Sequence, residues 1–359
     1  MNLLHLKKKL SGGKREIKMN RNLFGDTRHY YAITQIQERK TDKILDTTLE
    51  NRIRELLSFG KRDVKKLVEQ TCKQANIAIR EYLRAETALK LTQADKRQTV
   101  PYRVVDGIPK PLAAKLVGLP DPMLLLLLQK RQLIDEGEMS LDFVIRRYQE
   151  ITKVIPPEKD IQNDLKSSSE YFSNILKTID GLKLPDLIKE IEEDVLGAYF
   201  FHAPLIEIYW MPIGLIAGIL NVSVEDLSFV VLAHELAHAY SHLGLDIDGA
   251  QWDTNAFANT EMMIVEGLAQ YYTQSICDKY VSRQPNVLDT FKKLLKKQPT
   301  PYTHFQNWEI NHASEVVRFA MIAARSNNLK KYEDFLYAMD DIKKKISIKN
   351  TQMALLYEQ

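Results

Sequence analysis

The stretch from Val224 to Gly244 constrains the fold of this chain most, because it reads as one long helix carrying H-E-L-A-H at positions 234–238. Histidines four residues apart lie on the same helix face, about one turn from each other. His234 and His238 can therefore bind one metal ion together. Glu235 lies roughly 100° round the helix from His234, so it flanks such an ion and is free to act on a water molecule.

The residues around this motif indicate that the helix is buried in a domain. Ser223 can cap its N-terminus, with Asp226 closing a capping box, and Gly244 supplies a C-terminal stop. Before the motif the helix is apolar on nearly all sides, through Leu227, Phe229, Val230, Val231, Leu232 and Ala233. Burying two imidazoles and a carboxylate without partners costs several kcal/mol, and a bound metal ion would supply the partner. The alternative is a helix end whose histidines face solvent or hydrogen-bond to the backbone.

H-E-x-x-H on a helix is the signature of a zinc peptidase in which the glutamate is the general base. A catalytic zinc site usually has three protein ligands and an open position for water. The next expected helix offers Glu261 and Glu266, and Gly267 would permit a close approach of Glu266 to the metal. His242, one turn after His238, could ligate if the helix bent.

The segment Glu266-Gly-Leu-Ala269 completes a second motif. Together with the histidine motif it resembles the gluzincin group of zinc metallopeptidases, whose liganding glutamate follows on a later helix, often as E-G-x-A. The resemblance covers about Tyr199 to Tyr280 and implies that Glu266 is the third Zn²⁺ ligand. It does not extend to the N-terminal half of the chain.

Three departures limit what the resemblance implies. Some gluzincins carry an aspartate four residues after the ligand glutamate, where this chain has Gln270, a weaker partner for orienting a histidine. The G-x-M-E-N motif of one aminopeptidase family is absent, so aminopeptidase activity is unsupported. The metzincin pattern is unmet, because its third histidine would fall at Gly244.

Further side chains are candidates for supporting roles. A tetrahedral oxyanion needs a donor besides zinc, and the sequence offers Tyr271, Tyr272, His304, His312 and Arg318. Each of these is more often a packing or surface residue. Asp246 and Asp248 could orient the histidines, although loop aspartates usually form turns.

The expected fold is mostly α (α+β), with a zincin-like catalytic domain over 161–359 in which a small sheet packs on the motif helix. A helical N-terminal region covers 46–160, and a basic arm with a possible strand covers 1–45. The stretch Tyr199–Met211 reads as a strand, and Pro204 within it indicates a sheet edge or a bulge. Such an edge could pair with an extended peptide, or the strand could be an ordinary core strand.

The expected function is zinc-dependent peptide-bond hydrolysis, by an endopeptidase in which Glu235 activates a zinc-bound water and the partner is a protein or peptide substrate. The alternative is a non-hydrolytic regulatory or binding protein on a gluzincin-like fold. Intact ligands and Glu235 argue against it, because a binding protein needs no general base. A third reading, nucleic-acid binding through the basic termini, is weaker, since the net charge is only +3.

Composition favours a cytoplasmic protein without a membrane span. Cys72 and Cys277 lie far apart, which indicates a reducing compartment rather than a disulfide framework. The first residues are basic but lack the apolar region and cleavage site of a signal peptide. The longest aliphatic run, Leu124–Leu128, is far shorter than the roughly 20 residues that span a bilayer.

Overall fold

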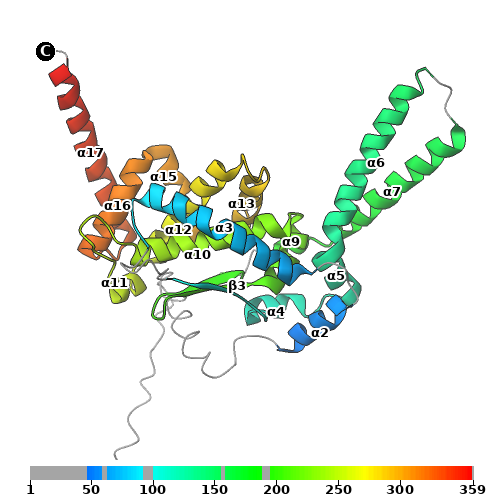
Figure 1. Ribbon diagram of the computed structural model, residues 1–359, viewed down its shortest axis with the longest axis horizontal. Helices are drawn as coiled ribbons and strands as arrows, with labels where there is room; N and C mark the ends of the chain where they lie inside the picture. The colour runs from blue at the N-terminus through cyan, green and yellow to red at the C-terminus, as the bar shows by residue number, and fades with distance from the viewer. Residues whose placement is uncertain (1–46, 59–62, 92–99, 155–157, 188–194, 358–359) are drawn as a thin grey trace, which may run out of the picture.

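The computed structural model describes residues 47–58, 63–91, 100–154, 158–187 and 195–357 (Figure 1). It is mostly helical with one three-stranded sheet, which confirms the expected fold class at that level. The basic arm and its possible strand lie outside the described residues. Within them, no helix is both long and apolar enough to cross a bilayer.

Helices dominate both halves of the chain. Those before residue 190 are α2 (Thr47–Ser58), α3 (Val64–Thr87), α4 (Lys110–Leu116), α5 (Asp121–Leu125), the π-helical segment η1 (Leu126–Lys130), α6 (Arg131–Ile151), α7 (Lys159–Gly181) and α8 (Leu184–Leu187). The later ones are α9 (Trp210–Leu220), α10 (Val224–Leu243), α11 (Thr254–Ala258), α12 (Met262–Tyr280), α13 (Val287–Leu295), α14 (Thr300–Thr303), α15 (Gln306–Asn311), α16 (Ser314–Asn327) and α17 (Tyr332–Tyr357).

The sheet has the strand order β1-β3-β2. Strand β1 (Tyr102–Val105) runs parallel to β3 (Leu205–Tyr209), and β2 (Gly197–Phe200) runs antiparallel to β3. The expectation of a single strand over Tyr199–Met211 is wrong. Residues 201–204 form a turn that includes Pro204, so the segment is a hairpin, and α9 begins directly after β3.

Helix α10 lies at the centre of the packing, in contact with α3, α12 and the sheet (Figure 1). The Ser223 hydroxyl accepts the expected capping hydrogen bond from the backbone N–H of Asp226, at 2.9 Å. Every residue of α10 except Glu225 and Leu243 is buried. A helix buried on all sides must satisfy its own polar groups inside the protein, which makes each polar side chain on it informative.

The C-terminus of α10 is held by a buried arginine from α16. The guanidinium of Arg325 donates to the carbonyl oxygens of Tyr240, Ser241, Gly244 and Ala250. The bonds to Ser241 and Gly244 satisfy carbonyls that the helix end leaves unpaired, and the positive charge complements the helix dipole. Burial lowers the pKa of Arg325 to about 10, so the side chain stays charged at neutral pH. The end of the motif helix is therefore fixed from outside.

Helices α6 and α7 form an antiparallel hairpin that projects from the body of the molecule (Figure 1). At its base, η1 packs against α9, where a Cβ atom on Gly218 would lie 2.3 Å from the carbonyl oxygen of Leu127. Only a glycine allows this close helix approach. The base of the hairpin is thereby joined to the core that surrounds α10.

Candidate metal centre

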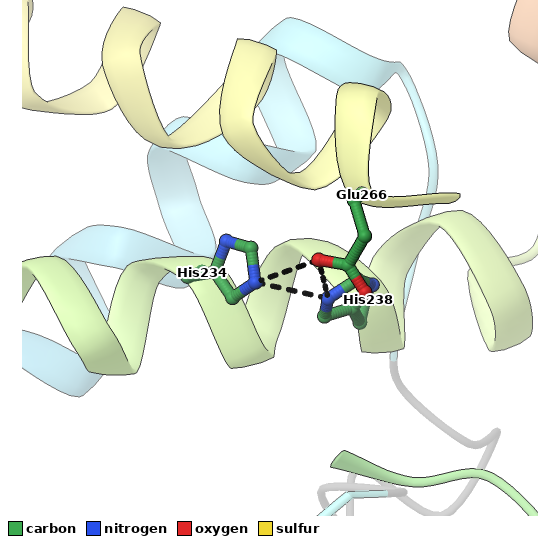
Figure 2. A group of neighbouring side chains, drawn as sticks. All are labelled: His234, His238 and Glu266. Atoms are coloured by element: carbon green, nitrogen blue, oxygen red, sulfur yellow. Dashed lines mark hydrogen bonds and ion pairs between the residues drawn. The ribbon is translucent and has the colours of Figure 1, made fainter. Parts of the chain in front are cut away.

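Two helices bring the three expected ligands together (Figure 2). His234 and His238 project from α10, and Glu266 projects toward them from α12. The two Nε2 atoms lie 3.0 Å apart, and one Glu266 oxygen lies 3.3 Å from that of His234 and 3.4 Å from that of His238. All three side chains are buried. This cluster could hold a metal ion.

The spacing of these three atoms fits a tetrahedral metal ion. Ligand atoms about 2.0–2.1 Å from a tetrahedral zinc ion stand roughly 3.3 Å from one another. The three measured separations, 3.0, 3.3 and 3.4 Å, match that value. Two imidazoles and one carboxylate are also a donor set used in catalytic zinc sites. The residues present therefore fit a divalent ion of this kind, although the arrangement alone does not identify the metal.

The two alternative third ligands are engaged elsewhere. Both ring nitrogens of His242 are occupied, Nδ1 by the Tyr199 hydroxyl at 2.8 Å and Nε2 by the Thr254 hydroxyl at 3.2 Å. Glu261 precedes α12 and accepts a hydrogen bond from the backbone N–H of Tyr332 at 2.8 Å. Neither residue joins the cluster. His242 would have needed a bend in α10, and α10 is a continuous helix.

Gly267 has a role in helix packing that the sequence did not predict. A Cβ atom there would lie 2.6 Å from the Trp308 ring and 3.0 Å from the His304 ring. The missing side chain therefore lets α14 and α15 pack against α12. The expectation that Gly267 permits a close approach of Glu266 to a metal ion stays a prediction.

The side chain of Glu235 extends from α10 to β2, an edge strand of the sheet. Its side chain is 2% exposed. A Cβ atom on Gly197 of β2 would lie 3.0 Å from its Cγ and Oε1 atoms and 2.9 Å from Val231. Glycine at this position thus allows the carboxylate to lie directly against the backbone of β2. The hydrogen bond between Tyr199 and His242 fixes the same strand to α10.

Tyr302 lies near the expected ligands, although the sequence did not single it out. It belongs to α14 and is almost fully buried, with its ring centroid 6.0 Å from that of His234. Its only sequence signal is the Pro-Thr-Pro run just before it, which predicts the start of a helix but not the packing of that helix on α12.

The expected oxyanion donors make contacts of their own. Tyr271 and Tyr272 follow Glu266 on α12 with their rings 5.3 Å apart, and burial raises the pKa of both. Arg318 lies over the Phe319 ring, and His312 lies 4.0 Å from Asp340. His304 packs edge-on against the rings of Trp308 and Tyr332. These contacts show that the side chains take part in packing, while Tyr272 Oη, His304 Nε2 and His312 Nδ1 are buried without a hydrogen-bond partner among the described residues.

The loop aspartates and Gln270 also make local contacts. Asp246 accepts hydrogen bonds from the backbone N–H groups of Asp248 and Ala250, as a turn former does. Gln270 donates to Gln298 at 3.1 Å. The Nδ1 atom of His234 is buried and has no hydrogen-bond partner among the residues that the structure describes.

Comparison with known proteins identifies no relative: no family model matches the chain, and neither does any curated protein or solved structure.

Proposed function

We propose that this protein is a zinc-dependent peptide hydrolase, an endopeptidase on a zincin-like fold that acts on a protein or peptide substrate. The observation that carries the proposal is the convergence of His234, His238 and Glu266 at tetrahedral spacing, with Glu235 on the same helix as the two histidines. A purely structural metal site needs four protein ligands and no adjacent base.

Zinc bound at this site would polarise the substrate carbonyl and make a water molecule more acidic. Glu235 would take the proton from that water and deliver it to the leaving amine. Its position against β2 restricts the side chain to a narrow range of orientations, as a general base requires. Tyr302 is a further candidate donor, because its ring lies 6.0 Å from that of His234 and a tyrosine hydroxyl can donate a hydrogen bond.

The sheet limits how an extended peptide substrate could bind beside Glu235. Among the described strands, β2 is at the edge of the sheet next to Glu235, and a peptide that pairs with its free edge would extend the sheet beside the strand that contacts Glu235. All four residues of β2 are buried, however, so in this conformation the strand is packed as a core strand. A substrate could pair with β2 only if the residues that bury this strand moved away from it.

The cysteines support a cytoplasmic location as part of the same proposal. Cys72 and Cys277 are both free and buried in the structure. Free thiols are the usual state in a reducing compartment.

The decisive experiment compares the wild type with Glu235→Gln by metal analysis and proteome-wide cleavage mapping. We expect equal zinc content and a loss of cleavage of at least about 1,000-fold in the variant, because the general base is gone. Glu225→Gln is the matched control, with the same change in the first turn of the same helix. Equal cleavage by wild type and Glu235→Gln would overturn the general-base role. A wild type that binds zinc but cleaves nothing would instead support the non-hydrolytic binding protein.

A further inference from the structure

The hairpin of α6 and α7 has two chemically different sides. In α6, Leu133, Val144 and Ile151 lie within about 20° of one another at 100° per residue. In α7 and its C-cap, Ile161, Tyr171 and Leu182 lie within about 80°. All six side chains are exposed, by 43% to 66%. Each helix thus exposes an apolar stripe to solvent.

Both apolar stripes lie on the same face of the hairpin. The seam between the helices is marked by Gly137, whose Cβ position is 3.3 Å from the Phe172 ring, and by Tyr148, whose hydroxyl accepts from the backbone N–H of Glu158. When residues are placed round each helix axis at 100° per residue, the apolar stripe lies at lower angles than the residues of this seam on both helices. Because the helices run antiparallel, the same sense of rotation brings both stripes to one side.

The opposite face of the hairpin is polar, and two further exposed apolar side chains of α6, Met139 and Phe143, lie between the two faces on the side away from α7. The polar face carries Asp135, Glu138, Asp142 and Gln149 from α6 and Asn163, Lys166, Glu170 and Lys177 from α7. The hydrogen bond from Ser169 to Asp142 lies on this side. A two-helix hairpin with one polar and one apolar face has the pattern of half a helical bundle.

We propose that the apolar face of the α6–α7 hairpin binds the same face of a second copy of this chain, forming a four-helix bundle between two protomers. The area supports this occupant. Six side chains with about 100 Å² exposed on each, together with the polar groups between them, approach the roughly 800 Å² per partner of a stable interface. The hairpin projects away from the body, so a second hairpin can lie along it with the bodies apart (Figure 1).

Charge also favours a second copy over an anionic membrane surface. The charged side chains in and beside the apolar face are Arg147, Glu136 and Asp164, so a second copy meets opposite as well as like charges. Across the hairpin, acidic residues outnumber basic ones. A helix that binds an anionic bilayer has a polar face rich in lysine and arginine instead.

The mass of the full-length protein in solution tests the proposal. We expect sedimentation equilibrium from about 1 to about 100 µM, a range that brackets a micromolar dimer, to show a dimer of the wild type. Val144→Glu with Tyr171→Glu should shift it to a monomer, because the added charges would be buried in the bundle. Gln149→Glu with Asn163→Glu adds the same charge to the polar face and should leave the dimer intact. Circular dichroism establishes that both variants fold.

Cross-linking gives a second readout that does not depend on weakening the interface. Both native cysteines are buried, so a single introduced cysteine can be addressed selectively. Val144→Cys should cross-link into dimers with a short bismaleimide, and Gln149→Cys should not. A monomeric wild type across the concentration range would overturn the proposal, whether or not it sediments with phosphatidylserine vesicles. So would a dimer that survives the Val144→Glu and Tyr171→Glu changes.

Discussion

Glu266 is the residue that completes, with two histidines on a helix, a cluster that could hold a metal ion. Replacing it by glutamine removes a charged ligand without a large change in volume, so zinc affinity should fall by at least about 100-fold. Competition with a chromophoric chelator measures this. Glu261→Gln is the matched control, because that carboxylate bonds to the backbone of Tyr332 and not to the cluster. Equal affinities in the two variants would remove Glu266 from the site.

The sequence predicted the three side chains that converge in the structure, because their positions follow from local rules. Spacing on one helix places His234 beside His238, and the E-G-x-A resemblance singled out Glu266. The sequence could not predict Tyr302, because its place beside His234 depends on how α14 packs on α12. The sequence could not predict the packing of Trp308 against Gly267 for the same reason, since the Trp308 ring comes from a later helix.

The burial of His242 predicts how the free energy of unfolding depends on pH. Burial lowers its pKa from 6.5 to about 3, so folded protein keeps this ring neutral while unfolded chain protonates it below about pH 6.5. A depressed pKa contributes stability that is present above the unfolded pKa and is lost as pH falls toward the folded pKa. This one group should cost about 1 kcal/mol of unfolding free energy between about pH 7 and pH 5.5.

Urea unfolding of His242→Gln isolates that effect. The variant can keep hydrogen bonds to Tyr199 and Thr254 but cannot titrate, so its loss of stability over the same pH interval should be smaller by about 1 kcal/mol. A chelator in all samples removes the proton-linked binding of metal at His234 and His238. An unchanged pH dependence would show that His242 is not buried in its neutral form.

At the scale of elements, the contact between β2 and α10 restricts the side chain of Glu235, the proposed general base. In Gly197→Ala, the new methyl group would meet Val231 and Glu235 at 2.9 and 3.0 Å, so the strand or the carboxylate must shift. We expect a stability loss of about 1–3 kcal/mol and peptide cleavage at least about 10-fold slower, with zinc affinity nearly unchanged. Gly118→Ala is the control, since its Cβ would meet nothing within 4 Å. A variant with normal cleavage would show that this contact does not position Glu235.

The elements that the sequence predicted well are those with strong internal periodicity. The motif helix, its capping by Ser223 and the following α12 all agree with expectation. The prediction of a single strand across Pro204 was wrong, because both strands of the observed hairpin are rich in aromatic and β-branched residues and resemble one continuous strand in the sequence. Strand β1 was missed within a proline-punctuated segment, because its stability comes from parallel pairing with a strand about 100 residues away.

At the scale of the whole molecule, the metal centre depends on segments that the sequence left in separate regions. Helix α3, from the expected N-terminal region, packs along α10 and belongs to the same hydrophobic core as α12 and α16. Local periodicity finds helices but not which of them become neighbours. This long-range packing is why the arrangement around the site could not be predicted from the sequence alone.

Because α10 and α12 hold the ligands at the centre of that core, metal binding should stabilise the entire fold. Zinc at 100 times its dissociation constant adds about 2.7 kcal/mol to the unfolding free energy, which raises the Tm by roughly 4 °C for a chain of this size. Differential scanning calorimetry with zinc and with a chelator measures the shift. His238→Ala should abolish it, whereas His202→Ala, a change in the turn between β2 and β3, should retain it. An equal zinc-induced shift in both variants would mean that the stabilising metal binds elsewhere.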